Sequence, residues 1–226
     1  MRFSVFLNAR AMRPEDDRQL IKDLEKHAKK ARDCGFEAIF MPDHHFNGYM
    51  PIASDSFIFA AYLAAQMPDM HFGFSVVSVP LHHPVRFVER INILDQLTDG
   101  KILVGVGSGT TPEEMIGFGV NYSEAKGVSD RNLEIAEALW AKTMDDPAIE
   151  IDNGPHKGRV IQRIAPVAYS KGHAPLIPVA MSEGSTRRAA QNGWPAFIPA
   201  FTPPQIGGTE PFKHVQKYFG AYKDQL

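Results

Sequence analysis

Residues 37–46 read Glu-Ala-Ile-Phe-Met-Pro-Asp-His-His-Phe and join a short apolar run to a cluster of ionisable side chains. The apolar run, residues 38–41, has the length of a buried β-strand. Asp43, His44 and His45 follow it directly. Because α/β barrels present their chemistry at the C-terminal ends of their strands, this stretch predicts both a fold class and a reactive face.

Strands and amphipathic helices alternate through the rest of the chain. Residues 72–79 contain no charged side chain, which is typical of a strand buried on both faces in a parallel sheet. The apolar patterns predict strands at 3–7, 38–41, 72–79, 102–106, 176–180 and 196–200, and helices at 56–67, 84–97, 185–191 and 212–226, with further helices starting at Asp16 or Asp17 and at Ser129. The order is β-α six times over.

Repeated βα units fit either a doubly wound sheet or a (β/α)8 barrel, and periodicity does not separate the two. The length of 226 residues is compatible with one domain spanning residues 1–226. Residues 145–170 are rich in Gly and Pro, and we interpret them as an insertion with a small hairpin.

The composition excludes several classes of function. A formal net charge of -2 provides no basic excess for binding nucleic acid. Residues 1–20 contain four arginines and no continuous apolar segment, so we expect a cytoplasmic protein without a signal peptide or membrane anchor. Cys34 has no partner thiol and is predicted to be a small buried side chain. His27 lies on the apolar stripe of the first helix, which predicts a core histidine.

The histidine pairs do not have the pattern of a metal site. His44 and His45 are adjacent on an extended segment, so their side chains point to opposite sides and cannot both bind one metal ion. We expect at least one of the two side chains to face a pocket at the strand ends. Alternatively, both form hydrogen bonds only with the loop that carries them. His83 precedes Pro84 and is placed to cap the helix that begins there.

The glycine-rich loop after residues 102–106 does not fit a dinucleotide fingerprint. Gly105, Gly107 and Gly109 have the wrong spacing, and the following Pro-Glu-Glu at 112–114 is acidic. The loop is interpreted as a close approach of the backbone to a ring or a neighbouring loop, or as a plain turn.

A second loop, at residues 182–186, carries hydroxyl groups at the start of a predicted helix. Free N–H groups and the helix dipole favour an anion such as phosphate at Ser182, Ser185 and Thr186, although ordinary N-capping also explains them. Arg131 is predicted in the first turn of its helix, where a cation opposes the dipole, which indicates an anionic ligand or an exposed surface arginine.

Several segments together resemble the bacterial luciferase-like flavin-dependent monooxygenases, in particular the luciferase α-chain branch. Their order and spacing agree with this family from the first strand to about residue 200. The segments are Asp-His-His-Phe at 43–46, His-Pro-Val-Arg at 83–86, Leu-Asp-Gln-Leu at 94–97 with Gly-Lys at 100–101, the glycine loop from residue 105, and residues 179–186.

The resemblance implies a TIM-type (β/α)8 barrel of the luciferase-like type, with about six of its βα units in this chain. It implies that reduced FMN, supplied by a separate flavin reductase, reacts with dioxygen and that the resulting C4a-peroxyflavin oxygenates a small aldehyde, ketone or hydrocarbon. A homo- or heterodimer is expected, without a metal.

Site residues follow from the same resemblance. His44 matches the catalytic histidine, and Ser75-Val76 matches a bulge where the family often has a non-prolyl cis peptide beneath the flavin ring. Asp43 stands where the family usually has Glu, Ser108 replaces a phosphate-binding arginine and Met181 replaces an acidic residue. The predicted flavin-binding residues are Ser75, Val76, Gly107, Ser108, Arg131, Met181, Ser182, Ser185 and Thr186.

Three other functions stay open at this point. A deazaflavin (F420)-dependent oxidoreductase on the same barrel would transfer hydride without oxygen. A non-catalytic flavin-binding protein and a metal-dependent barrel hydrolase are the remaining alternatives, and the hydrolase lacks an HxH pair on one strand face.

Overall fold

The computed structural model describes residues 2–46, 53–180, 189–191 and 194–197. The chain divides into two compact units, Met1–Pro175 and Leu176–Leu226, and each is described by itself. The single domain expected over the whole chain stays a prediction.

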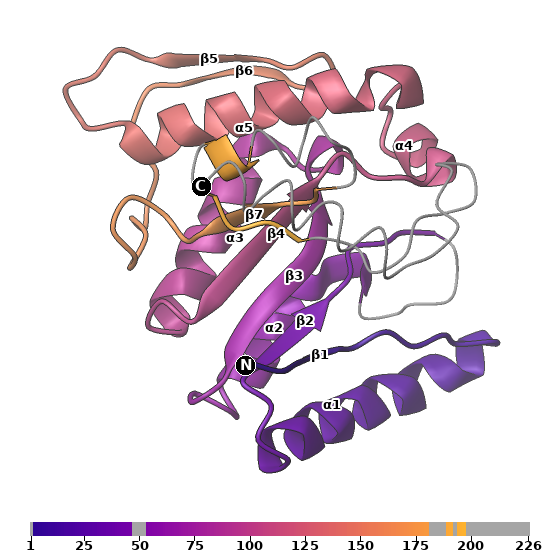
Figure 1. Ribbon diagram of the computed structural model, residues 1–226. Coiled ribbons are helices and arrows are strands. Elements are labelled where there is room, and N and C mark those ends of the chain that lie inside the picture. The colour runs from indigo at the N-terminus through magenta and orange to yellow at the C-terminus, as the bar shows by residue number, and fades with distance from the viewer. Residues whose placement is uncertain (1, 47–52, 181–188, 192–193, 198–226) are drawn as a thin grey trace. The chain divides into compact units, whose positions relative to one another are not determined.

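A parallel sheet forms the centre of the first unit. Strands β1 (Ser4–Phe6), β2 (Ala38–Met41), β3 (His71–Ser78) and β4 (Ile102–Gly107) lie side by side in this order (Figure 1). Every residue of β2 is buried, which is why its sequence shows no polar alternation. The parallel arrangement brings the C-terminal ends of the strands to one edge of the sheet, as predicted.

Helices connect these strands and pack on the sheet and on one another. The helices are α1 (Asp17–Asp33), α2 (Ser56–Ala64), α3 (Pro84–Leu97), α4 (Pro112–Gly117) and α5 (Ala125–Ala141). Helix α2 packs against β3 and α3, and α3 packs against β4 and α5. Among the helices of the described residues, none combines the length and the apolar character that crossing a membrane requires.

Two predicted helix boundaries are confirmed by their backbone and side chains. Gly35 has φ 83° just after α1, the left-handed conformation in which glycine commonly ends a helix. Pro84 is the first residue of α3, and Nδ1 of His83 accepts a hydrogen bond from the Val85 N–H at 3.2 Å. His83 is therefore the predicted helix cap.

The start of α5 differs from the prediction, which was wrong in placing Ser129 at the cap. The helix begins about one turn earlier, at Ala125, and Ser129 is buried within it. Ala125 and Val128 pack in a buried cluster with Leu81, so tertiary contacts extend the helix toward its N-terminus. Arg131 consequently lies in the second turn of α5, and the argument that it opposes the dipole in the first turn is wrong.

Two predictions about α1 were also wrong. Cys34 is exposed at the C-terminal cap of the helix, and His27 is exposed on its surface. The buried face of α1 consists of Leu24, Ala28 and Ala31. The true stripe is thus narrower than the sequence pattern indicates, and His27 falls beside it.

The hairpin expected within residues 145–170 is present. Strands β5 (Ile149–Asp152) and β6 (Lys157–Val160) pair in antiparallel register. In the second unit, β7 (Leu176–Pro178) lies within the strand predicted at 176–180, and Val179 forms a parallel bridge with Phe197. Most of the predicted helix at 185–191 and strand at 196–200, and all of the helix at 212–226, lie outside the described residues.

Candidate functional site

The predicted site residues His44, Ser75, Val76, Gly107 and Ser108 lie near or just after the C-terminal ends of β2, β3 and β4. The pairing of β2 with β3 ends at Met41 and Phe74, and the pairing of β3 with β4 ends at Ser78 and Gly107. His44 comes three residues after β2, and Ser108 comes directly after β4. Residues far apart in the sequence therefore reach one edge, where barrel enzymes carry their chemistry.

Strand β3 contains the predicted bulge. The peptide bond between Ser75 and Val76 is cis, and the register with β4 shifts between Phe74 and Val77. A Cβ atom on Gly107 would lie 2.9 Å from Cγ2 of Val76, so the close approach of the two strands requires glycine there. The last residue of β4 thus packs against the neighbouring strand. The roles predicted for the glycine loop, an approach to a ring or a neighbouring loop or a plain turn, stay predictions.

Small, half-buried residues surround this bulge. Ser75, Val76, Gly107 and Ser108 all have intermediate exposure, between the buried sheet and solvent. Short side chains and a glycine allow another group to approach the backbone closely.

The two adjacent histidines have different partners, as their extended backbone predicts. Nδ1 of His44 lies 3.0 Å from Oε1 of Glu114, while Nε2 of His45 lies 3.3 Å from Oδ1 of Asp43. The backbone N–H of His45 donates to the same Glu114 oxygen at 2.8 Å. Within the part of the chain that the structure describes, no cluster of His, Cys, Asp or Glu could hold a metal ion.

Glu114 is the site residue that the sequence analysis missed. It lies on α4, a helix that was not predicted, and its side chain is 1% exposed. The signals of a helix start are present, because Pro112 occupies the first position and Glu113 and Glu114 fill the first turn. Helix α4 was not predicted because it is short and follows directly on a glycine-rich loop.

Asp43 holds the strand ends together. Its Oδ2 accepts hydrogen bonds from the Ser78 N–H and from Nε2 of His82, both at 2.9 Å. Burial by itself would raise the pKa of Asp43, but the interactions with His45, His82 and Ser78 outweigh it and hold the pKa well below its usual range. Asp43 is therefore an anion at neutral pH that links the end of β2 to β3 and to the segment before α3.

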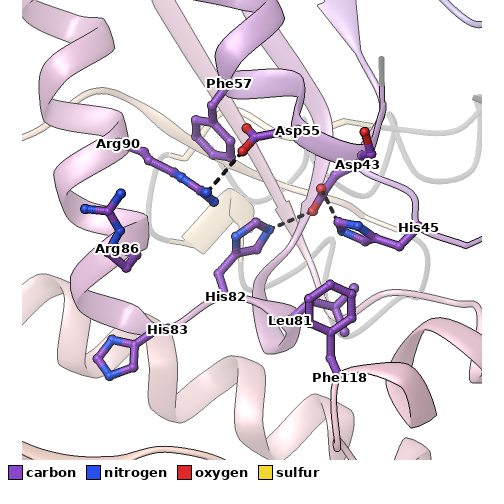
Figure 2. Close-up of a pocket in the computed structure, with 11 residues that line it drawn as sticks. Asp43, His45, Asp55, Phe57, Leu81, His82, His83, Arg86, Arg90 and Phe118 are labelled. Atoms are coloured by element: carbon purple, nitrogen blue, oxygen red, sulfur yellow. Dashed lines mark hydrogen bonds and ion pairs between the residues drawn. The ribbon is translucent and has the colours of Figure 1, made fainter. Parts of the chain in front are cut away.

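A cavity of about 300 Å³ lies beside this carboxylate (Figure 2). His45, and not His44, contributes to its wall. The charges at the wall are paired, since Asp43 binds His82 and Nη2 of Arg90 lies 3.1 Å from Oδ2 of Asp55. Because Nε2 of His45 faces the Asp43 carboxylate at 3.3 Å, we assign His45 to support of the loop.

The other predicted flavin residues are not joined to this edge by the described contacts. Nη2 of Arg131 donates to the Asn153 carbonyl at 2.9 Å, which ties α5 to the turn of the β5–β6 hairpin. Met181, Ser182, Ser185 and Thr186 lie outside the described residues. Their part in binding a phosphate stays a prediction.

A parallel α/β sheet with ionisable side chains at its C-terminal edge is the arrangement in which α/β enzymes carry their sites. The family is given by sequence comparison, since residues 1–211 match the model of the luciferase-like monooxygenases. The chain belongs to this family. A curated relative, the alkanal monooxygenase alpha chain of Photorhabdus luminescens, is 28% identical over 198 residues, which cover 88% of this chain and 53% of the relative.

Solved structures confirm the predicted fold class, the TIM-type barrel of the luciferase-like proteins. The monooxygenase RslO1 of Streptomyces bottropensis is similar with a TM-score of 0.81 and 22% identity, over 100% of this chain and 65% of RslO1. The oxygenating constituent of 3,6-diketocamphane monooxygenase from Pseudomonas putida, solved with FMN, gives a TM-score of 0.77 and 16% identity, over 100% of this chain and 62% of that protein.

The alkanal monooxygenase alpha chains cover most of this chain in the comparison, but the chain spans only about half of their length. At this coverage, family and fold are shown, while the activity, substrate and partners of the whole protein are proposals.

Proposed function

We propose that the protein is an FMN-dependent monooxygenase that uses reduced flavin and dioxygen to oxygenate a small organic molecule such as an aldehyde, ketone or hydrocarbon. The observation that carries the proposal is the C-terminal edge of the sheet, where His44 follows β2 and Gly107 packs against Val76 of the cis peptide bond Ser75–Val76. Membership in the luciferase-like family and the similarity of the fold to an FMN-bound monooxygenase support it.

The residues at this edge fit the ring of the cofactor. The half-buried backbone at Ser75 and Val76 would lie against one face of the isoalloxazine, and Gly107 and Ser108 would line its side. The phosphate would be held by the predicted residues of the second unit, Ser182, Ser185 and Thr186, with Met181 beside them and Arg131 of the first unit as a further candidate. Reduced FMN would supply the electrons that activate dioxygen.

His44 is proposed as the acid-base group of the reaction. Its side chain is 33% exposed, so the ring is held by Glu114 on one side and accessible on another. A histidine can donate or accept a proton near neutral pH, which suits a reaction in which oxygen atoms gain and lose protons. Asp43 and His45 keep the loop that carries His44 in place.

Three further features belong to the same proposal. A separate reductase would deliver the reduced FMN, the protein would act in the cytoplasm, and it would assemble as a homo- or heterodimer. These expectations rest on the family resemblance.

The proposal is tested with purified protein, chemically reduced FMN, dioxygen and a panel of aldehydes and ketones. We expect an oxygenated product with at least one panel member and a loss of about 100-fold or more in His44→Ala, the usual contribution of a general acid-base group. His27→Ala, which removes an exposed histidine from α1, should leave the rate unchanged.

A titration with FMN and with deazaflavin, followed by absorbance and fluorescence, separates the alternatives. Tight binding of deazaflavin without uptake of FMN would point to a hydride-transferring oxidoreductase. Binding of FMN without turnover of any panel member would point to a flavin-binding protein without activity.

A further inference from the structure

Glu114 and His44 form a buried pair whose geometry restricts where the histidine carries its protons. Oε1 of Glu114 lies 3.0 Å from Nδ1 of His44 and also accepts the backbone N–H of His45 at 2.8 Å. The other carboxylate oxygen, Oε2, is buried and has no hydrogen-bond partner among the described residues. All polar contacts of this carboxylate with the described residues therefore pass through Oε1.

A buried carboxylate is costly unless donors compensate its charge. The His45 N–H provides one donor. If Nδ1 of His44 carried no proton, two acceptors would face each other at 3.0 Å, and the carboxylate would retain a single partner. A proton on Nδ1 removes this repulsion and supplies a second donor, which favours an Nδ1–H group pointing at Glu114.

Packing on both sides of Glu114 restrains the segment that carries the carboxylate. Glu114 lies on α4 beside Met115, which is fully buried in the cluster around Leu81. The ring of Phe118, just after α4, lies against the ring of His45 with centroids 4.6 Å apart. Helix α4 and the residue that follows it therefore contact the loop after β2 through a hydrogen bond and an aromatic contact, which restrain the carboxylate beside His44.

We propose that Glu114 is a positioning residue that fixes His44 with a proton on Nδ1 and leaves Nε2 as the nitrogen that exchanges protons with bound molecules. This inference rests on the proposed function, in which His44 is the acid-base group. With Nδ1 engaged, Nε2 is the remaining ring nitrogen, and a fixed ring orientation keeps it at one place in the site.

The experiment measures the protonation of both His44 ring nitrogens by two-bond ¹H–¹⁵N NMR on the full chain with labelled histidine, at about pH 8, above the usual titration range of histidine. His44→Gln identifies the signal. We expect a protonated Nδ1 in the unsubstituted protein. Glu114→Met removes the acceptor and should shift His44 to the Nε2–H form, whereas Glu114→Gln retains an acceptor oxygen and should keep the Nδ1–H form.

Glu113→Gln is the matched control, because Glu113 is exposed on the same turn of α4. It should leave the His44 signal unchanged. In oxygenation assays, Glu114→Met should lower the rate of a single turnover by about 100-fold, the usual effect of losing alignment of a reacting group, without changing FMN affinity. Glu114→Gln should recover part of that rate.

An unprotonated Nδ1 in the unsubstituted protein, as a protonated Glu114 would produce, would overturn the inference, and this result requires no substitution at Glu114. An unchanged His44 signal in folded Glu114→Met would also overturn it. A failure of the proposed function has a different signature, namely no oxygenation by the unsubstituted protein while the NMR result still shows Nδ1–H.

Discussion

Individual side chains decide the chemistry of this site through contacts between distant parts of the chain. His44 could be predicted as a site residue because its position after a buried strand is visible in the sequence. Its partner could not, since Glu114 is 70 residues away and the contact exists only after the sheet has formed. The same holds for Asp43, whose role depends on Ser78 and His82.

Replacing Asp43 tests the network at the strand ends. In Asp43→Asn, His45, His82 and the Ser78 N–H lose a charged acceptor in a buried place, which should lower the free energy of unfolding by about 3 kcal/mol. Urea unfolding followed by circular dichroism measures this. The exposed Asp23→Asn is the control and should change stability by less than about 0.5 kcal/mol.

The same network predicts a direction for the effect of acid. The pKa of Asp43 is lower in the folded protein than in the unfolded chain, where an aspartate titrates near about 3.9. Its stabilisation is therefore complete above that pH and is lost as the pH falls toward the folded pKa. The stability of Asp43→Asn should depend less on pH below about 4 than that of the unsubstituted protein. An equal loss of stability in the two proteins below this pH would contradict this assignment.

At the scale of elements, the strands were predicted well and the connections less well. Strands β2 and β3 consist of apolar runs whose burial follows from composition, so their positions agree with the prediction. Helix α4 was not predicted, and the predicted start of α5 lies too late in the chain. Packing around Leu81 and Met115 determines both features, and the local sequence pattern does not encode it. Propensity is a weak guide where tertiary contacts extend or create a turn of helix.

The close packing of the strands predicts a strong effect at Gly73 of β3. A Cβ atom there would overlap the ring of Phe40 and lie 3.0 Å from the Leu103 carbonyl, so both neighbouring strands would have to move. Gly73→Ala should lower the free energy of unfolding by about 1–3 kcal/mol. Gly158→Ala, on β6 with open space around it, is the control, and an equal loss in the two variants would refute the packing argument.

At the scale of the molecule, the sequence predicts the fold class and the family, and the comparisons confirm both. Four of the residues proposed to bind the flavin, Met181, Ser182, Ser185 and Thr186, lie outside the described residues. The prediction of a site without a metal rests on the adjacent histidines, which contact different partners in the structure. The substrate depends on loops whose shapes a sequence pattern does not encode.

In the proposed function, the protein inserts oxygen from dioxygen into a substrate with the help of His44. The direct measurement is mass spectrometry of the product formed from reduced FMN and a panel substrate under ¹⁸O₂. We predict one labelled oxygen atom in each product molecule, with the label falling to the free-flavin background in His44→Ala. An unlabelled product, or equal product in the absence of dioxygen, would contradict the account.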